Sequence, residues 1–259
     1  RTIDEALTRA VDSEKEGYRY SYDMLGEGAR TADDAGRYFK NYEMAIDRIG
    51  KAAAGRSIHD APNISVKLSA LHPRYEYAQR HLAIPALTKK LLVLAQKCAH
   101  YNIGLTIDAE EAHRLEISME IIEAVFTHDS LKNWDGFGLA IQAYHKRCYA
   151  LIEWLASLAA DTNRRMMVRL VKGAYWDSEI KYAQVNGLPA YPVYTRKAAT
   201  DVSYLACAQK LLAERAWIYP MFATHNAYSV ASILELAGSD QTGFEFQRLH
   251  GMGDGLYHQ

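Results

Sequence analysis

The sequence predicts an α/β fold of the (βα)8 barrel class, and two observations lead to it. Short apolar runs alternate with longer segments of helical period along the 259 residues, an order that implies parallel strands joined by helical crossovers. Polar residues also stand at or near the C-terminal ends of the predicted strands, where a barrel gathers its catalytic residues on one face. The alternative is a doubly wound open sheet, which concentrates ligand contacts at one switch point.

The elements follow in order along the chain. A helix at 2–16 forms a lead-in that we place at residues 1–18, and the barrel is expected over residues 19–259. Strands are predicted at 19–25, 64–70, 104–110, 136–144, 166–173, 219–226 and 244–252. Helices are predicted at 31–53, 82–100, 114–127, 147–160, 176–186, 196–214 and 228–237. Thr31 stands three residues before Asp34, which is typical of a capping box at a helix start. Seven strands are one fewer than a closed barrel uses, so we expect the last β/α unit to be missing from this chain.

Composition excludes several classes of protein. Hydrophobic residues make up 49% and charged residues 24% of the chain, as in an ordinary globular protein. Lys and Arg total 30 against 31 Asp and Glu, so no basic surface for nucleic acid is indicated. The three cysteines lack CxxC spacing, which fits a reducing cytoplasm better than a disulfide framework or a zinc site. Complete GxGxxG, GxxxxGK[ST] and HExxH motifs are absent, so a Rossmann site, a P-loop and a compact metal site are unsupported.

Lys67 is the first candidate site residue. It follows Ile64 and Val66 in the run ISVKLSA and faces away from their apolar layer. A lysine on a buried strand needs a partner or a ligand, but a rim lysine that reaches solvent explains the pattern equally well. Asp108 either caps the following helix or pairs with Lys67 across neighbouring strands. For Glu110 and Glu111 we predict ordinary positions in the first turn of a helix.

Two further segments carry polar groups at predicted strand ends. In VRLVKGAYWD (168–177) two cations, a glycine and two aromatic residues follow one another, a combination suited to a large planar anion. A plain strand that ends in packed aromatic residues is the alternative. THN (224–226) adds a hydroxyl, an imidazole and an amide, although a lone histidine such as His225 is more often a core residue.

Several blocks taken together resemble the proline dehydrogenase barrel of bacterial proline utilisation A proteins. They are YSYDMLGEGA (20–29), VKLSALHPRY (66–75), IDAEE (107–111), IQAY with KRC (within 141–148), RLVKGAYWDSEIK (169–181), YPVYTRK (191–197), TDVSYLACA (200–208), FATHNA (222–227) and EFQRLHGMG (245–253). The resemblance covers nearly the whole chain. It implies a distorted (βα)8 barrel that holds FAD noncovalently and oxidises L-proline to Δ1-pyrroline-5-carboxylate by hydride transfer to the flavin N5.

The resemblance also implies roles for individual residues. Lys67 would anchor the proline carboxylate, Asp108 would orient the site, Tyr175 would pack against the proline ring and Arg169 would act near the flavin N5. Glu27 would be a gate residue that pairs with an arginine. The implied FAD-binding residues are Gln142, Arg169, Val171, Lys172, Gly173, Ala174, Trp176, Thr195, Arg196, Lys197, Thr224, His225, Asn226 and Gln247.

The same resemblance sets expectations beyond this segment. The family's eighth helix, with paired arginines that clamp the proline carboxylate, would follow residues 250–253, and its DNA-binding arm and aldehyde dehydrogenase domain are not in this chain. A quinone is the expected electron acceptor, which places the protein in the cytoplasm or at the periphery of the inner membrane. Two alternatives stay open: a Schiff-base lyase that uses Lys67 as its nucleophile, and a barrel that binds flavin without turnover.

Overall fold

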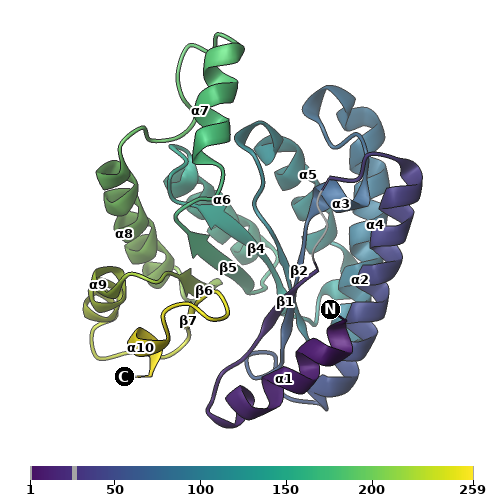
Figure 1. Ribbon diagram of the computed structural model, residues 1–259, viewed down its shortest axis with the longest axis vertical. Helices are drawn as coiled ribbons and strands as arrows, with labels where there is room; N and C mark the ends of the chain where they lie inside the picture. Colours follow the sequence, from purple (N-terminus) through teal and green to yellow (C-terminus); the bar gives the residue numbers. More distant parts are fainter. Residues whose placement is uncertain (1, 25–27, 259) are drawn as a thin grey trace. The chain divides into compact units, whose positions relative to one another are not determined.

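The computed structural model describes residues 2–24 and 28–258, and its chain divides into two compact units, Arg1–Leu139 and Ala140–Gln259. Strands and helices alternate in both (Figure 1). The described elements of the first unit are α1 (Ile3–Lys15), β1 (Ser21–Asp23), α2 (Ala32–Ala53), β2 (Asn63–Val66), α3 (Leu68–Leu71), η1 (Tyr77–Gln79), α4 (Arg80–Tyr101), β3 (Gly104–Ile107), η2 (Ala112–Arg114), α5 (Leu115–Phe126), η3 (Asp129–Leu131) and the start of β4 (Phe137–Gln142).

The strands of the first unit are parallel and pair in chain order. Tyr22 of β1 lies opposite Ile64, Ile64 opposite Leu105, and Leu105 opposite Phe137. Every residue of β2 and β3 is buried, as expected for parallel strands covered on both faces. The predicted parallel α/β arrangement is therefore confirmed within this unit.

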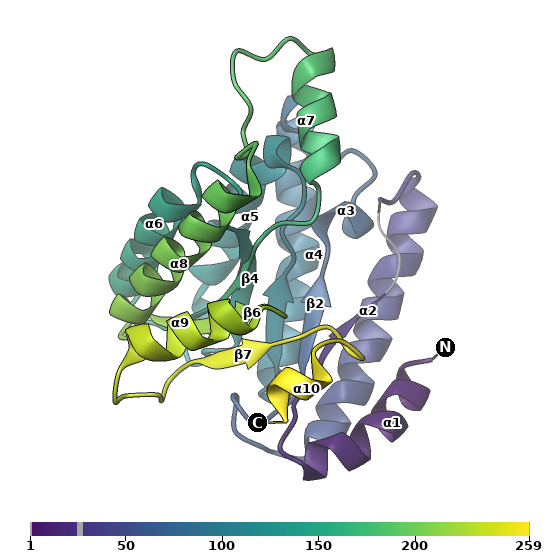
Figure 2. The ribbon, with the colours of Figure 1, turned by 60° about the vertical axis from the view of Figure 1, so that its left-hand side comes forward.

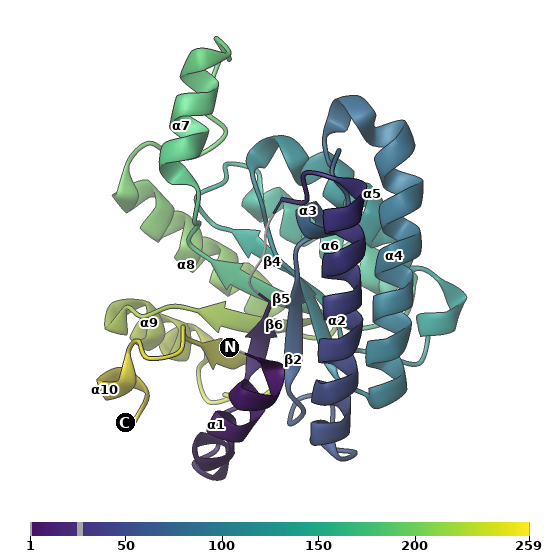
Figure 3. The ribbon, with the colours of Figure 1, turned by 45° about the vertical axis from the view of Figure 1, so that its right-hand side comes forward.

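Helices α2 and α4 pack side by side in the first unit, and α1 contacts α2 (Figure 3). Buried α2 residues recur at helical spacing, from Tyr42 through Ile46 and Ile49. Helices α2 and α4 approach closely at Gly50 of α2, where an added Cβ would overlap the ring of Tyr101 on α4. The capping box predicted at Thr31 is present, with reciprocal side-chain contacts between Thr31 and Asp34.

The second unit repeats the same order. Its described elements are the end of β4, α6 (Cys148–Asp161), β5 (Met166–Val171), α7 (Trp176–Val185), α8 (Lys197–Ala213), β6 (Ile218–Ala223), α9 (Ala227–Ala237), β7 (Glu245–Gln247) and α10 (Asp254–Tyr257). Arg169 lies opposite Met221, and Met221 opposite Glu245, so β5, β6 and β7 are parallel neighbours. Figure 2 shows α8 packed between α6 and α9.

Each predicted strand ends two to five residues later than the observed strand, and the error is largest in two of them. The run predicted at 64–70 leaves the sheet after Val66, and residues 68–71 form the single turn of α3 instead. The run predicted at 244–252 forms a strand only over Glu245–Gln247 and then turns, where the Met252 amide donates to the Leu249 carbonyl. The division at residue 18 stays a prediction. None of the helices within residues 2–24 and 28–258 is long and apolar enough to cross a membrane.

Candidate active site

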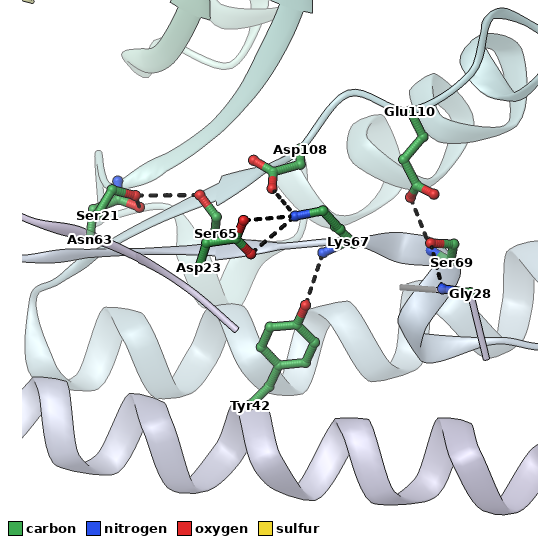
Figure 4. Close-up of polar contacts among 10 residues, drawn as sticks. All are labelled: Ser21, Asp23, Gly28, Tyr42, Asn63, Ser65, Lys67, Ser69, Asp108 and Glu110. Atoms are coloured by element: carbon green, nitrogen blue, oxygen red, sulfur yellow. Dashed lines mark hydrogen bonds and ion pairs between the residues drawn. The ribbon is translucent and has the colours of Figure 1, made fainter. Parts of the chain in front are cut away.

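Lys67 lies at the centre of an ion-pair cluster in the first unit. It follows the last residue of β2 and occupies the N-cap position of α3. Its Nζ lies 3.0 Å from each carboxylate oxygen of Asp23 and 2.8 Å from Oδ2 of Asp108 (Figure 4). The side chain of Lys67 is 8% exposed, so the rim-lysine alternative is wrong. The predicted pairing of Lys67 with Asp108 is present.

The electrostatics of this cluster keep the lysine charged. Burial lowers the pKa of Lys67, but the charges and hydrogen bonds of Asp108 and Asp23 outweigh burial and raise the pKa above its ordinary value of 10.5. A Schiff-base nucleophile needs a neutral amine, usually obtained by lowering its pKa. Lys67 is therefore suited to act as a fixed cation for an anionic ligand, and its environment opposes the lyase alternative.

The backbone next to Lys67 is also held in place. Its amide donates to the hydroxyl of the buried Tyr42 over 3.2 Å, and burial raises the pKa of Tyr42 to about 12. Two residues later, the Ser69 amide donates to Oε1 of Glu110 over 3.0 Å (Figure 4). Glu110 thus caps α3 from a distant segment, and its predicted role in the first turn of the next helix is wrong. Glu111 precedes η2 as its N-cap residue, close to the predicted position.

Sequence reasoning missed Asp23 as a partner of Lys67. Asp23 is the last residue of β1, and it lies opposite Ser65 in the register with β2. Its position at a strand end was the available signal, but the sequence does not say which strand-end residues touch. Glu27, the predicted gate residue, lies outside the described residues.

Arg169 is held by a side-chain network in the second unit. It projects from β5, and its Nε donates to Oε1 of Gln247 on β7 over 2.7 Å. The Nε2 of Gln247 donates in turn to Oε1 of Glu245 over 2.6 Å. Both predicted residues, Arg169 and Gln247, are thus brought together, whereas no sequence pattern indicated Glu245.

A close backbone approach follows β5. The amides of Ala143 and Tyr144 donate to the carbonyls of Val171 and Lys172, each over 2.8 Å. Gly173 has a φ of 140°, and an added Cβ would lie 2.5 Å from the ring of Tyr144, so only glycine fits there. The backbone conformation and the nearby Tyr144 ring therefore both require glycine at position 173, which was predicted as a cofactor-binding residue.

The amide that follows Gly173 is also fixed. The Ala174 N–H donates to Oε1 of the buried Gln142 over 3.2 Å. Tyr175 occupies the N-cap position of α7 and is partly exposed. The indole Nε1 of Trp176 donates to the Tyr194 carbonyl over 2.9 Å, and Trp176 is 40% exposed.

Cationic groups gather at the start of α8. Lys172 and Lys197 bind the two carboxylate oxygens of Asp201, over 2.5 Å and 2.7 Å respectively. This arrangement brings two predicted cofactor-binding lysines to one carboxylate that the prediction did not include. Thr195 and Arg196 are exposed and immediately precede Lys197.

The THN segment lies at the end of β6. Thr224 is buried, and its hydroxyl accepts a hydrogen bond from the Asn226 amide. Asn226 caps α9 through the Ser229 amide. His225 is exposed, and its Nε2 accepts from the Leu249 amide over 2.9 Å. The core-histidine alternative is therefore wrong.

The donor set of the second unit fits an extended anion with a flat ring system. Positive charge comes from Arg169, Lys172 and Lys197. The backbone of Gly173 lies close to the ring of Tyr144, and Trp176 offers an accessible aromatic face. Among the described residues no cluster of three or more His, Cys, Asp or Glu could hold a metal ion.

Comparisons with known proteins identify the family. Residues 6–259 match the family model described as proline dehydrogenase. The chain is 56% identical over 260 aligned positions to the bifunctional protein PutA of Klebsiella aerogenes, covering 100% of this chain and 20% of that protein. This chain therefore spans about a fifth of the length of the curated relative it matches.

Solved structures agree with this assignment. A crystal structure of a proline utilization A mutant from Bradyrhizobium japonicum is 57% identical, with a TM-score of 0.92 over 99% of this chain and 26% of the other. Proline utilization A from Bdellovibrio bacteriovorus, inactivated by N-propargylglycine, is 29% identical, with a TM-score of 0.92 over 98% of this chain and 28% of the other. The chain belongs to the proline dehydrogenase family.

Proposed function

We propose that this chain is the proline dehydrogenase part of a longer bifunctional protein and oxidises L-proline to Δ1-pyrroline-5-carboxylate with FAD. The observation that carries the proposal is the family match, which extends over residues 6–259. The side-chain geometry is consistent with it, because the first unit holds a charged lysine and the second a cationic set suited to a flavin dinucleotide.

Lys67 anchors the substrate carboxylate in this proposal. Its amine stays protonated, and two carboxylates fix its position, so it presents a point charge in a defined place. Asp23 and Asp108 orient Lys67 and offset its charge when no substrate is bound. Tyr175 packs against the proline ring. Anchoring of this kind selects the substrate orientation in which the reacting C–H bond meets the oxidant.

The cofactor would be held by the second unit. Its phosphates and ribose would be bound by Lys172, Thr195, Arg196 and Lys197, and also by the polar groups of residues 224–226. Arg169 and Gln142 would bind its ring system with Gln247, and residues 171–174 and Trp176 would line it. When bound, FAD supplies the two-electron acceptor that takes a hydride from the carbon beside the proline nitrogen, while the nitrogen proton leaves to solvent.

We also propose that the two units are parts of one distorted (βα)8 barrel. In each unit the neighbouring strands are parallel and consecutive in the chain. A barrel keeps this order throughout, whereas a doubly wound sheet reverses it at a switch point.

The longer protein is proposed to pass its electrons to a quinone and its product to an aldehyde dehydrogenase domain. A cytoplasmic location with peripheral contact to the inner membrane goes with a quinone acceptor. The relatives are named bifunctional proteins, which supports a second domain. Reduction of a soluble quinone analogue by the proline-reduced protein, with sedimentation alongside lipid vesicles, tests both statements.

Bleaching of the flavin by proline tests the main proposal. The purified protein, supplied with FAD, should be yellow and should lose its flavin absorption when L-proline is added without oxygen. Lys67→Met should raise the proline concentration needed for bleaching, whereas Lys97→Met, a lysine paired with Asp47 and Glu43, should not. A yellow protein that L-proline never bleaches would support flavin binding without turnover. Colourless protein trapped by borohydride with a carbonyl substrate would support the lyase and refute the proposal.

A second experiment addresses Arg169. A guanidinium near the reacting end of the cofactor stabilises negative charge that develops during reduction. We therefore expect Arg169→Ala to slow flavin reduction at saturating proline much more than it raises the KM for proline. Equal changes in both would contradict that role.

A further inference from the structure

A chain of polar contacts joins Glu245 to Arg169 in the second unit. Oε1 of Glu245 accepts from Nε2 of Gln247 over 2.6 Å, and Oε1 of Gln247 accepts from Nε of Arg169 over 2.7 Å. On its other side, Oε2 of Glu245 accepts from the Tyr219 hydroxyl over 3.4 Å. The sheet register fixes this geometry, because Arg169, Met221 and Glu245 lie opposite one another on β5, β6 and β7.

Glu245 determines which way the Gln247 amide points. A glutamine amide has donors at one end and an acceptor at the other. Because the carboxylate of Glu245 can only accept, it takes the NH2 end and leaves the carbonyl oxygen for Arg169. The opposite orientation would turn the NH2 group toward the Arg169 N–H and the carbonyl toward the carboxylate, and both contacts would be lost. Nε of the guanidinium is thus held, which limits its rotation.

Glu245 also sets the local charge. Burial raises the pKa of Glu245, while the hydrogen bond from Gln247 and the charge of Arg169 lower it in part. Because these side chains are partly buried, the Glu245 carboxylate interacts with the Arg169 guanidinium more strongly than it would at the surface. The positive charge that Arg169 offers to a ligand is therefore reduced by a negative charge two side chains away.

We propose that Glu245 is a positioning residue that orients Arg169 through Gln247 and moderates the positive charge felt by the flavin. The inference rests on the proposed function, because it takes Arg169 to face the cofactor. Two effects follow and can be separated. Loss of the carboxylate charge alone should make the flavin easier to reduce, since the site becomes more positive. Loss of the hydrogen-bond acceptor should release Gln247 and Arg169.

Two substitutions at Glu245 separate these effects. Glu245→Gln keeps the side-chain shape and an acceptor oxygen for Gln247 but removes the charge. It should raise the flavin midpoint potential, measured by anaerobic dye equilibration, and leave the Kd for FAD within about twofold of the unmodified protein. Glu245→Ala removes the acceptor as well, and it should slow flavin reduction at saturating proline by about 10-fold or more, with a much smaller change in KM. Glu235→Gln, an exposed glutamate on α9 of the same unit, is the matched control and should change none of these values.

The outcomes distinguish this inference from the proposed function. An unmodified protein that L-proline bleaches, together with a Glu245→Gln potential equal to that of Glu235→Gln, would overturn the role of Glu245 alone. An unmodified protein that takes up no FAD would overturn both proposals. If Glu245→Ala does not fold, the potential of the nearly isosteric Glu245→Gln still decides the matter.

Discussion

Replacement of Lys67 by methionine tests whether its ion pairs act as a partly buried cluster. Methionine keeps the apolar stem but removes the charge, and it leaves Asp108, whose side chain is 16% exposed, without its cation. Removal of one partner from a buried pair costs about 3–5 kcal/mol. Asp23 is 47% exposed, so its contact adds at most about 1 kcal/mol. Because Asp108 also retains some access to water, we expect a loss near the lower end, about 3 kcal/mol.

The matched control is Lys97→Met in the same unit. Lys97 also lies between two carboxylates, those of Asp47 at 3.1 Å and Glu43 at 3.6 Å, but its side chain is 28% exposed and theirs are 39% and 31% exposed. Pairs of this kind contribute about 0.2–1 kcal/mol. Urea unfolding followed by far-UV circular dichroism gives the free energy of unfolding of both variants. A loss in Lys67→Met no larger than that in Lys97→Met would refute the reasoning.

The pH dependence gives an independent test of the same cluster. Both carboxylates lie within 3.0 Å of the Lys67 nitrogen, so they are within about 6 Å of each other and repel when the cation is removed. The stability deficit of Lys67→Met therefore measures what the charge of Lys67 contributes in the unmodified protein. In the unmodified protein the pKa of Lys67 is raised above 10.5. The contribution of its charge to the free energy of unfolding is therefore fully present below pH 10.5 and is lost only as the pH rises through the higher folded-state pKa. A deficit that stays constant as the pH is raised above 10.5 would contradict this account.

Three further predictions concern single positions. Gly173 has a φ of 140°, and an added Cβ there would meet the ring of Tyr144, so Gly173→Ala should lower the free energy of unfolding by about 1–3 kcal/mol. Gly187→Ala should lower it less, because φ at Gly187 is 59° and nothing lies within 4 Å of an added Cβ. Thermal unfolding compares the two variants. Thr31→Ala removes a capping box and should cost about 1 kcal/mol by the same measurement. Glu110→Ala should cost more than Glu110→Gln, because glutamine still accepts from the Ser69 amide. Burial raises the pKa of Glu110 above its ordinary value of 4.5. The protonated side chain therefore stabilises the fold below pH 4.5, and this contribution declines as the pH rises through the folded-state pKa. Urea unfolding at several pH values should show the stability of the unmodified protein, relative to Glu110→Gln, falling as the pH rises.

Elements with a strong local signal could be predicted from the sequence. Helix α4 has buried residues such as Leu87, Leu91 and Leu94 at helical spacing and covers nearly the predicted range. The capping box at Thr31 needs only residues three positions apart, so it is visible without tertiary structure.

The errors occur where distant residues decide the local structure. Residues 68–70, which belong to the single turn of α3, were predicted as strand. A single helical turn has no readable period, and its cap, Glu110, lies 41 positions away from Ser69. Asp23 and Lys67 are separated by 44 positions, and only the register of β1 with β2 brings them together. The partner of Gln247 was missed for a related reason, since a short strand gives no sign that Glu245 turns toward its neighbour.

The segment after β2 and the segment after β3 are joined twice, with the same spacing on each. Lys67 binds Asp108, and two positions later on both segments the Ser69 amide binds Glu110. One tie is an ion pair between side chains and the other uses a backbone donor that no substitution of Ser69 except proline removes. For protein engineering, the two segments therefore form one transferable part. A graft or insertion between residues 108 and 110 that moved Asp108 would leave Lys67 with Asp23 alone, and one that moved Glu110 would leave the Ser69 amide of α3 without its carboxylate acceptor.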